Sequence, residues 1–337
     1  MVVGAGALGN AVVENLGRAG IERIVVADPE VVEPKNLECS PLFRDVAGTV
    51  GRSKAVVVAE AMATRFPKTR LLALDREIAD LGFADIAEAG ILFGCVDSEL
   101  ARLEIAYIAA KLDLPVCDGG LGSPDAVRGR VSWYPGREAA CYGCGLTASK
   151  RRELLTTWDS PVHPCAGPTD PPPRTATPEV AAVVGALQVE TALRPPGEAC
   201  SMEVRLTPER VVETVRLARA EACPFHVAEE RLVDATAEKI GDLLAGAAAL
   251  SEGEPVLLLD WPVCVDALCL ECGRKWHPMR RVGWVRRRGA CPHCGSRRVR
   301  DLETITRVAQ DSVWAAAAFA ELGLARNHLH TIRFEAQ

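Results

Sequence analysis

The sequence lacks any long uncharged apolar run. Its longest apolar runs, such as residues 181–189, are far shorter than the roughly 18 residues that a membrane-spanning helix needs. The first residues also lack the basic stretch and following apolar stretch that mark a secretory signal. We therefore expect a soluble, cytoplasmic protein that has no membrane partner.

An excess of positive charge is also missing. The 337 residues include 45 Asp and Glu against 39 Lys and Arg, which gives a net charge of −6. This balance makes nucleic acid an unlikely partner. The charge is uneven, however, because residues 274–300 contain basic side chains and no acidic ones. That segment is either a docking face for a partner or a solvated surface around a small metal module.

Cysteine, by contrast, is abundant, with 13 in the chain. The cytosol keeps thiols reduced, and pairs with two residues between them have the spacing of metal ligands, so we expect metal sites rather than disulfides. Cys269 and Cys272 are followed after eighteen residues by Cys291 and Cys294. This spacing predicts a structural Zn²⁺ in a zinc ribbon over residues 264–300.

A second set of candidate ligands is split along the chain. Cys141 and Cys144 form one short pair, and Cys223 and His226 form another. Together they predict a second structural zinc site, with three thiolates and one imidazole. The alternative is two independent turns whose side chains never meet.

Residues 1 to about 125 alternate between strand-like and helix-like patterns. Such alternation predicts an α/β fold with a doubly wound, mostly parallel sheet and ligands at the carboxyl ends of its strands. The expected strands are 2–3, 24–27, 71–74, 91–96 and 115–117, and the expected helices are 10–20, 53–66 and 100–112. After His226 we expect a small α+β unit over residues 227–337, with a helix near 235–249, a strand at 256–259 and the zinc ribbon.

A proline-rich segment interrupts the chain over residues 160–178. Its seven prolines exclude a helix or a central strand and predict an extended loop. Thr177 as N-cap and Pro178 at the first helical position then begin a helix. Its body, residues 180–193, is nearly all apolar, so we expect that helix to be buried.

The N-terminal glycines predict a nucleotide site. Gly4, Gly6 and Gly9 follow the first short strand, and Asp28 closes the next apolar run. Such glycines permit a tight turn close to phosphate, and a carboxylate about 20 residues on can hold a ribose hydroxyl. The motif does not distinguish ATP from a dinucleotide, so a dehydrogenase remains an alternative.

Several motifs follow one another in a characteristic order. They are the glycine turn, Asp28-Pro-Glu30 with Asn36-Leu37, Val50-Gly-Arg-Ser-Lys54, and Cys95-Val-Asp97 with Arg102. With these motifs the chain resembles the ThiF-like family over residues 1–226. That family consists of adenylyltransferases that activate ubiquitin-like and sulfur-carrier proteins and include the molybdopterin and thiamine biosynthesis enzymes.

The resemblance implies a Rossmann-like domain that binds ATP and Mg²⁺. Adenylation requires a cation on the phosphates and a carboxylate for Mg²⁺, and Lys54 and Asp97 can supply these. By family position, Asp28 holds the ribose, Asn36 lies near the phosphates and the three glycines line the nucleotide. Taken singly, Lys54 could be a surface lysine and Asp97 could cap the next helix. We expect Arg102 to anchor a local group rather than touch substrate.

One position departs from the family pattern. Family members have an arginine two residues beyond Leu37, directed at the ATP phosphates, and this chain has Cys39. Arg44, Arg52 or a partner subunit could supply the missing cation. Without one, the chain would be a non-catalytic partner or scaffold of a heteromeric activating enzyme.

The resemblance also assigns a role to Cys165 in the proline-rich loop, where the family places the cysteine that receives the activated acyl group. An incidental loop cysteine is the alternative. The expected activity is adenylation of a small ubiquitin-like protein with a C-terminal glycine, then thioester formation at Cys165. A conjugating enzyme and a second subunit, in a homo- or heterodimer, are further expected partners.

Overall fold

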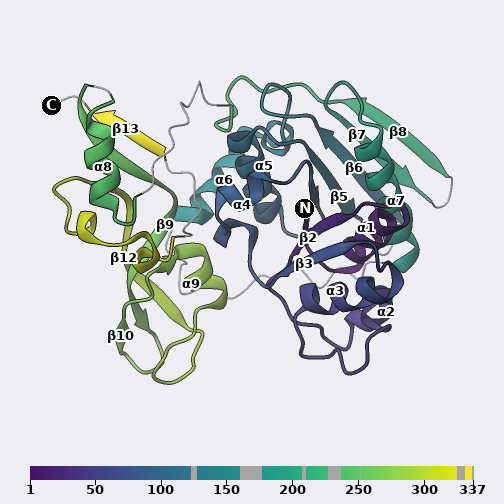
Figure 1. The fold of residues 1–337 in the computed structure, drawn as a ribbon, viewed down its shortest axis with the longest axis horizontal. Coiled ribbons are helices and arrows are strands. Elements are labelled where there is room, and N and C mark those ends of the chain that lie inside the picture. Colours follow the sequence, from purple (N-terminus) through teal and green to yellow (C-terminus); the bar gives the residue numbers. More distant parts are fainter. Residues whose placement is uncertain are drawn as a thin grey trace. The chain divides into compact units, whose positions relative to one another are not determined.

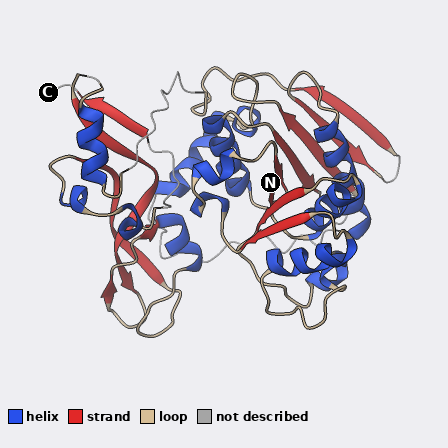
Figure 2. Cartoon of the chain, viewed as in Figure 1, coloured by secondary structure: helices blue, strands red, loops and turns tan. Residues whose placement is uncertain are grey.

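The computed structural model describes residues 1–122, 127–159, 177–206, 210–226, 237–250, 252–324 and 331–335. The chain divides into two compact units, residues 1–148 with 170–226 and residues 149–169 with 227–337 (Figure 1). Helices flank the sheet of the first unit, whereas strands make up most of the second (Figure 2).

The first unit is built on an eight-stranded sheet in the order β3-β2-β1-β4-β5-β6-β7-β8. Five strands are parallel, which confirms the doubly wound sheet: β1 (Val2–Val3), β2 (Arg23–Ala27), β3 (Arg70–Leu74), β4 (Leu92–Gly94) and β5 (Val116–Leu121). Three antiparallel strands that the sequence did not predict extend it: β6 (Arg128–Tyr134), β7 (Cys200–Arg205) and β8 (Val211–Arg216).

Helices cover both faces of this sheet. Alternate residues of β5 show the two faces, because a side chain at Gly119 would meet α7 (Pro178–Leu193), whereas one at Gly120 would approach Arg102 of α5 (Glu99–Leu112). Helices α1 (Ala7–Arg18) and α3 (Lys54–Arg65) contribute to the same buried core as α7. The other helical segments are α2 (Asn36–Cys39), η1 (Pro41–Phe43), η2 (Ile78–Asp80), α4 (Phe83–Ala87), η3 (Tyr142–Gly145) and α6 (Ala148–Asp159).

Helix α7 begins where the sequence predicts, with Thr177 as N-cap and Pro178 in the first turn. The expectation that it is buried is correct for one side only. Val184 and Gln188 are fully buried, but Ala182 and Ala186 are exposed and Leu193 is 46% exposed. An apolar composition therefore did not mean burial all round.

The second unit is organised around one long strand. β9 (Glu254–Cys269) pairs with every other strand of a five-stranded sheet, so the predicted strand 256–259 is only its beginning. The partners are β10 (Lys275–Trp276), β11 (Arg280–Arg281), β12 (Val299–Ala309) and β13 (Thr331–Glu335). One core forms around α8 (Ile240–Ala248) with η4 (Val313–Ala316) and η5 (Phe319–Leu322), and another around α9 (Val282–Arg288).

Within the described ranges, every helix is too short or too polar to cross a lipid bilayer.

Candidate active site and metal centres

The central strand β1 brings the ends of three strands to one edge of the sheet. Val3 lies opposite Ala27 of β2 on one side and opposite Gly94 of β4 on the other, all in parallel register. The residues that follow these positions therefore leave the sheet at the same carboxyl edge. The strand order reverses between β1 and β4, which is where doubly wound sheets hold ligands.

The three glycines of the opening turn have different tasks. Gly4 has φ +98°, and a Cβ there would lie 2.6 Å from the Cys95 carbonyl oxygen. A Cβ at Gly9 would lie 2.0 Å from the Gly4 carbonyl oxygen, whereas one at Gly6 would have no atom within 4 Å. Gly4 and Gly9 thus permit packing, and Gly6 leaves open space at the N-terminus of α1. The unpaired N–H groups there suit an anion.

Asn10 holds this turn in place, and the sequence prediction missed it. Its side chain is 1% exposed. Nδ2 donates to the carbonyl oxygens of Ala5 and Gly6 at 2.8 and 3.0 Å, and Oδ1 accepts from the Leu42 N–H at 3.1 Å. Asn10 therefore ties the glycine turn to the segment that contains Cys39 and Arg44. A polar residue among the apolar positions of α1 was the available signal.

Asp28 closes the other side of the turn. It is 5% exposed and accepts hydrogen bonds from the N–H groups of Ala5 at 2.6 Å and Glu30 at 2.8 Å. Burial raises the pKa of the Asp28 carboxyl, and the Ala5 N–H and the charge of Lys54 oppose that rise. The carboxylate is fixed at the strand edge, as a ribose-binding group must be.

Lys54 is a buried cation at the same edge. Only 7% of the residue is exposed, so the alternative of a surface lysine is wrong. Its Nζ donates to Oε2 of Glu30 at 2.6 Å, and the Glu30 side chain is 58% exposed. An exposed partner can turn away at low cost, so the ammonium is available to a phosphate.

Asp97 follows β4 and is exposed, and in the described part of the chain it has no hydrogen-bond or ion-pair partner. Ser98, rather than Asp97, caps α5, because its Oγ accepts from the Ala101 N–H at 3.2 Å. The capping alternative for Asp97 is therefore wrong. Its carboxylate is open to a cation at the same edge as the glycine turn.

The cations around position 39 are unequally available. Cys39 ends α2, and its Sγ lies 3.8 Å from the Asn36 carbonyl oxygen. Arg52 forms an ion pair with Glu60. Arg44 is exposed and has no ion-pair partner among the described residues. Asn36 starts α2, and its Oδ1 accepts from the Glu33 N–H at 2.9 Å.

Arg102 anchors backbone and carboxylate groups, as the sequence predicts. Its Nη2 donates to the carbonyl oxygens of Val96 at 2.5 Å and Gly119 at 2.8 Å, and its Nε lies 3.5 Å from Asp118. Asp118 is 3% exposed and also pairs with Arg130 at 3.0 Å. Burial raises the pKa of Asp118, and the two arginines oppose this.

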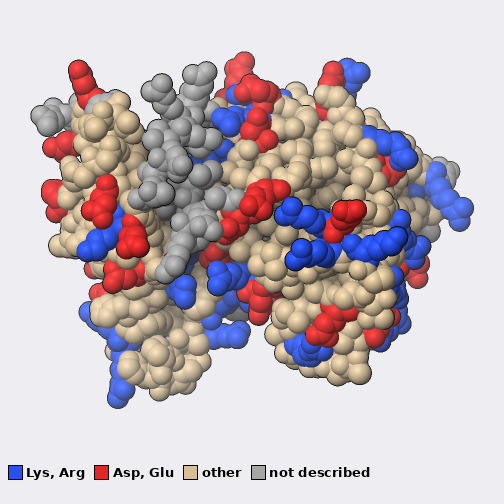
Figure 3. All heavy atoms as spheres, in the orientation of Figure 1, with Lys and Arg blue, Asp and Glu red and all other residues tan. Residues whose placement is uncertain are grey.

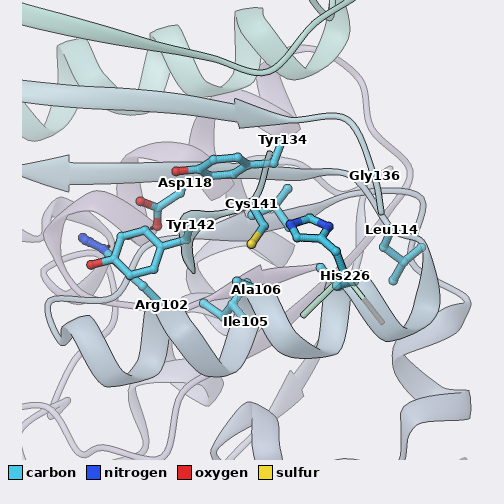
Figure 4. A pocket seen from close by; sticks show the side chains of 13 residues that line it. Arg102, Ile105, Ala106, Leu114, Asp118, Tyr134, Gly136, Cys141, Tyr142 and His226 are labelled. Carbon is cyan, nitrogen blue, oxygen red and sulfur yellow. Dashed lines mark ion pairs between the residues drawn. The ribbon is translucent and has the colours of Figure 1, made fainter. Parts of the chain in front are cut away.

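A cavity lies between α5 and the strands that carry this network (Figure 4). Arg102, Asp118, Tyr134 and Tyr142 gather at one end of it, and His226 lies towards the other. Its volume of about 20 Å³ is room for about one water molecule. The cavity is therefore not a nucleotide site.

Cys141, Cys144, Cys223 and His226 come together from two distant segments, so the alternative of independent turns is wrong. Cys141 Sγ lies 3.8 Å from Cys144 Sγ and 3.6 Å from Cys223 Sγ. Thiolates about 2.3 Å from a tetrahedral Zn²⁺ are about 3.8 Å apart, so the set fits that ion. His226 Nδ1 donates to the Arg137 carbonyl oxygen at 2.8 Å, which directs Nε2 to the centre.

The second cluster fits the same ion. Cys269 Sγ lies 3.5 Å from Cys294 Sγ, and Cys272 Sγ lies 3.7 Å from Cys291 Sγ. All four ligand atoms lie within 4.8 Å of one another. Four thiolates and no open position are typical of a structural zinc site.

Among the cysteines outside the two clusters, Cys95 and Cys117 are buried. Burial raises the pKa of the Cys95 and Cys117 thiols, so both stay neutral and fill the core. Gln188 of α7 lies between them, and its Nε2 donates to the carbonyl oxygens of Gly94 and Cys117 at 3.2 and 2.9 Å. Cys165 lies outside the described residues.

Comparison with known proteins agrees with this geometry. The family model described as "ThiF family" matches residues 1–199. A NEDD8-activating enzyme E1 catalytic subunit of Caenorhabditis elegans is 33% identical over 119 residues, which are 35% of this chain and 27% of that protein. The sulfur carrier protein ThiS adenylyltransferase of Escherichia coli K12 is 27% identical over 148 residues, 43% of this chain and 56% of that one.

The solved structures add the fold. The crystal structure of E. coli MccB superposes with a TM-score of 0.51 at 17% identity, over 70% of this chain and 67% of MccB. These two curated relatives are matched over only 27% and 56% of their length. The family match itself lies within residues 1–199.

Proposed function

Because this chain belongs to the ThiF family, we propose that its first unit binds ATP and adenylates the C-terminal carboxylate of a small ubiquitin-like or sulfur-carrier protein. The observation that carries the proposal is the meeting of the glycine turn, Lys54 and Asp97 at one edge of the sheet. This is the set of groups that a nucleotide and its metal require. The relatives named above are an activating enzyme of that class and a ThiS adenylyltransferase.

In the proposed reaction, the carrier carboxylate attacks the α-phosphorus of ATP. A new P–O bond forms to the carboxylate oxygen, the bond from the α-phosphorus to the bridging oxygen breaks, and pyrophosphate leaves. The open backbone at Gly6 admits the phosphates beside the N–H groups of α1, and Asp28 accepts from the ribose. Lys54 leaves Glu30 and neutralises phosphate charge. Asp97 would hold Mg²⁺, which when bound shields the leaving pyrophosphate.

Pyrophosphate exchange tests this proposal directly. Purified chain, ATP, labelled pyrophosphate and candidate carriers ending in glycine should give label in ATP with at least one carrier. Asp97→Asn should abolish exchange and keep the fold. Exchange absent with every carrier, together with no ATP binding by calorimetry, would end the proposal.

We propose as a second step that the adenylated carrier passes to Cys165. The thiolate would attack the acyl carbon, form the thioester and release AMP. A carrier adduct that is cleaved by hydroxylamine and lost in Cys165→Ala would support this step. An adduct that persists in Cys165→Ala would refute it without affecting adenylation. Conjugating enzymes as downstream partners, and a cytoplasmic location, remain predictions.

A dimer is proposed on the outer side of α7. Ala182, Ala186 and Leu193 are exposed there beside the exposed Glu179 and Glu190, and such a mixed apolar and charged surface can form a protein interface. Leu193→Glu should shift the chain towards monomer in analytical ultracentrifugation. An unchanged sedimentation profile would contradict this assignment.

Cys39 favours a second candidate function, that of a non-catalytic subunit. If the chain is itself an active enzyme, we propose that Arg44 replaces the phosphate-binding arginine that is missing at Cys39, because Asn10 ties the segment of Arg44 to the glycine turn. If the chain acts alone, Arg44→Ala should lower exchange strongly. If wild type is inactive and Cys39→Arg restores exchange, the chain is the inactive partner of another subunit.

A further inference from the structure

The metal-binding end of the second unit presents two faces of different character. Lys275 of β10 and Arg300 of β12 both lie opposite Leu268 of β9. Residues directly opposite in antiparallel strands project to the same face, and the neighbouring row projects to the other. The next row, with Trp276 and Asp301 opposite Ala267, therefore belongs to the other face.

Helix α9 covers the Ala267 face. Val282 and Val285 form a buried cluster with Ala267, and the two tryptophans of this region, Trp276 and Trp284, pack against it. Arg286 of α9 pairs with Asp301 through two hydrogen bonds of 3.0 Å, and both side chains are less than 10% exposed. The aromatic side chains and one arginine of the basic segment are thus used in folding.

The Leu268 face holds exposed cations around apolar side chains. Lys275, Arg298 and Arg300 are exposed, and the Arg298 carbonyl oxygen accepts from the N–H of Leu270, which is 38% exposed. We call Leu268, Leu270, Lys275, Arg298 and Arg300 the ribbon face. In Figure 3, basic side chains outnumber acidic ones on the visible surface of this unit's lower end, where Figure 1 places β10.

Acidic residues bound this surface rather than neutralise it. Between residues 267 and 300 the only acidic residue is Glu271, which pairs with Arg298 at 2.9 Å. Two residues along β9 from Leu268, Asp266 lies opposite Glu303. Asp266 also accepts a hydrogen bond from His277. A metal held by four thiolates carries net negative charge that offsets part of the positive charge. Arg274 and Arg297, which flank the two cysteine pairs, are exposed as well, so a surplus remains.

We propose that the ribbon face docks an acidic segment of a partner protein whose apolar side chains alternate with its carboxylates. Leu268 and Leu270 supply apolar area at the centre, and the cations at the rim pair with carboxylates and speed the encounter. Nucleic acid fits less well, because binding of bases needs exposed aromatic side chains for stacking and the tryptophans here pack on the covered face. This inference concerns the second unit and does not depend on adenylation by the first.

Fluorescence anisotropy with the full, metal-loaded chain tests the proposal. The probes are a labelled 12-residue peptide of alternating Glu and Leu, its Lys-Leu counterpart and a labelled 12-nucleotide oligo-dT. We expect the Glu-Leu peptide to bind, the Lys-Leu peptide not to bind, and added salt to weaken the complex. Lys275→Glu with Arg300→Glu should weaken binding roughly tenfold or more, and Leu268→Ser should also weaken it.

Arg287→Glu is the matched control, because this exposed arginine lies on α9, the helix that covers the opposite face. It should bind the Glu-Leu peptide as wild type does. If the double variant loses metal, Lys275→Gln with Arg300→Gln replaces it. Failure of the Glu-Leu peptide to bind, or equal losses in Arg287→Glu, overturns the proposal. Oligo-dT binding that is stronger than peptide binding and is lost in the same variants would assign the face to nucleic acid instead.

Discussion

Arg102 Nη2 donates a hydrogen bond of 2.5 Å to the carbonyl oxygen of Val96, the residue before Asp97. The same guanidinium also holds Gly119 and faces Asp118. Asp97 has no partner of its own in the described part of the chain, so its backbone alone sets where its carboxylate lies. Arg102 is thus placed to hold the backbone that carries Asp97.

Arg102→Ala should therefore raise the Mg²⁺ concentration needed for half-maximal exchange, and Arg102→Lys should restore it only in part, because lysine cannot reproduce the fork of the guanidinium. A double-mutant cycle with Asp97→Asn checks the route, measured for all four proteins as the Mg²⁺ dependence of ATP binding by calorimetry, because the Asp97→Asn variant has no exchange activity. If Arg102 acts through Asp97, its loss should have no further effect on Mg²⁺ dependence in the Asp97→Asn background. If Arg102→Ala shifts the Mg²⁺ dependence as much in the Asp97→Asn background as in wild type, Arg102 has a purely structural role.

Gly6 and Gly9 should separate binding from folding. Gly6→Ala places a Cβ in open space at an N-cap with φ −70°, so the melting temperature should stay near wild type while ATP binding weakens roughly tenfold or more. Gly9→Ala drives a Cβ into the Gly4 carbonyl and should destabilise the fold by more than about 1 kcal/mol. Calorimetry measures the ATP affinity of each variant, and thermal melting measures its stability. Equal ATP affinity in Gly6→Ala and wild type would contradict the placement of the phosphates.

Lys54→Met keeps the volume of a buried side chain and removes its charge. Exchange should fall about 100-fold or more, as when one stabilising donor is lost from a transition state, with little change in stability. Arg52→Met is the control, because Arg52 is paired with Glu60 of α3. Comparable losses in both variants would indicate a general charge effect rather than a specific contact by Lys54.

Metal analysis should find two zinc ions per chain. Cys272→Ser should remove one ion and unfold the second unit, because the small core of that unit depends on its metal. ATP binding by the first unit should persist. His226→Cys should retain both ions, since a fourth thiolate also completes a tetrahedral site. Elemental analysis counts the zinc ions in each variant, and circular dichroism shows whether the variant is folded. Two retained ions in Cys272→Ser would contradict the ligand set.

Asp118→Asn should change how stability depends on pH. Burial raises the pKa of Asp118, so the folded chain keeps this proton where the unfolded chain releases it. Its contribution to stability is therefore present at low pH and is lost as the pH rises through the folded pKa. Urea unfolding should show the variant gaining stability relative to wild type as the pH rises above about 4, the ordinary pKa of an aspartate. The opposite slope would mean that Arg102 and Arg130 outweigh burial.

The local elements were largely predictable because their signals lie within a few residues. The glycine turn, the proline start of α7 and the two-residue cysteine spacings needed no tertiary information. β7 and β8 were not predicted, because most of β8 and part of β7 are exposed and an exposed strand has no clear apolar alternation. β9 was predicted too short, since Asp260 and Pro262 interrupt its apolar pattern near the middle.

By itself, the sequence determined the parallel sheet, the position of the glycine turn and the eight residues of the two candidate metal clusters, since each depends on short-range pattern and residue chemistry. Only the tertiary structure decided that Lys54 is buried beside Glu30 and that Asn10 ties the turn to Leu42. It alone also showed that Lys275 and Arg300 flank Leu268 on a face away from the tryptophans. Burial and strand register arise from contacts between residues that are distant in the chain, and a local sequence pattern does not specify which distant residues meet.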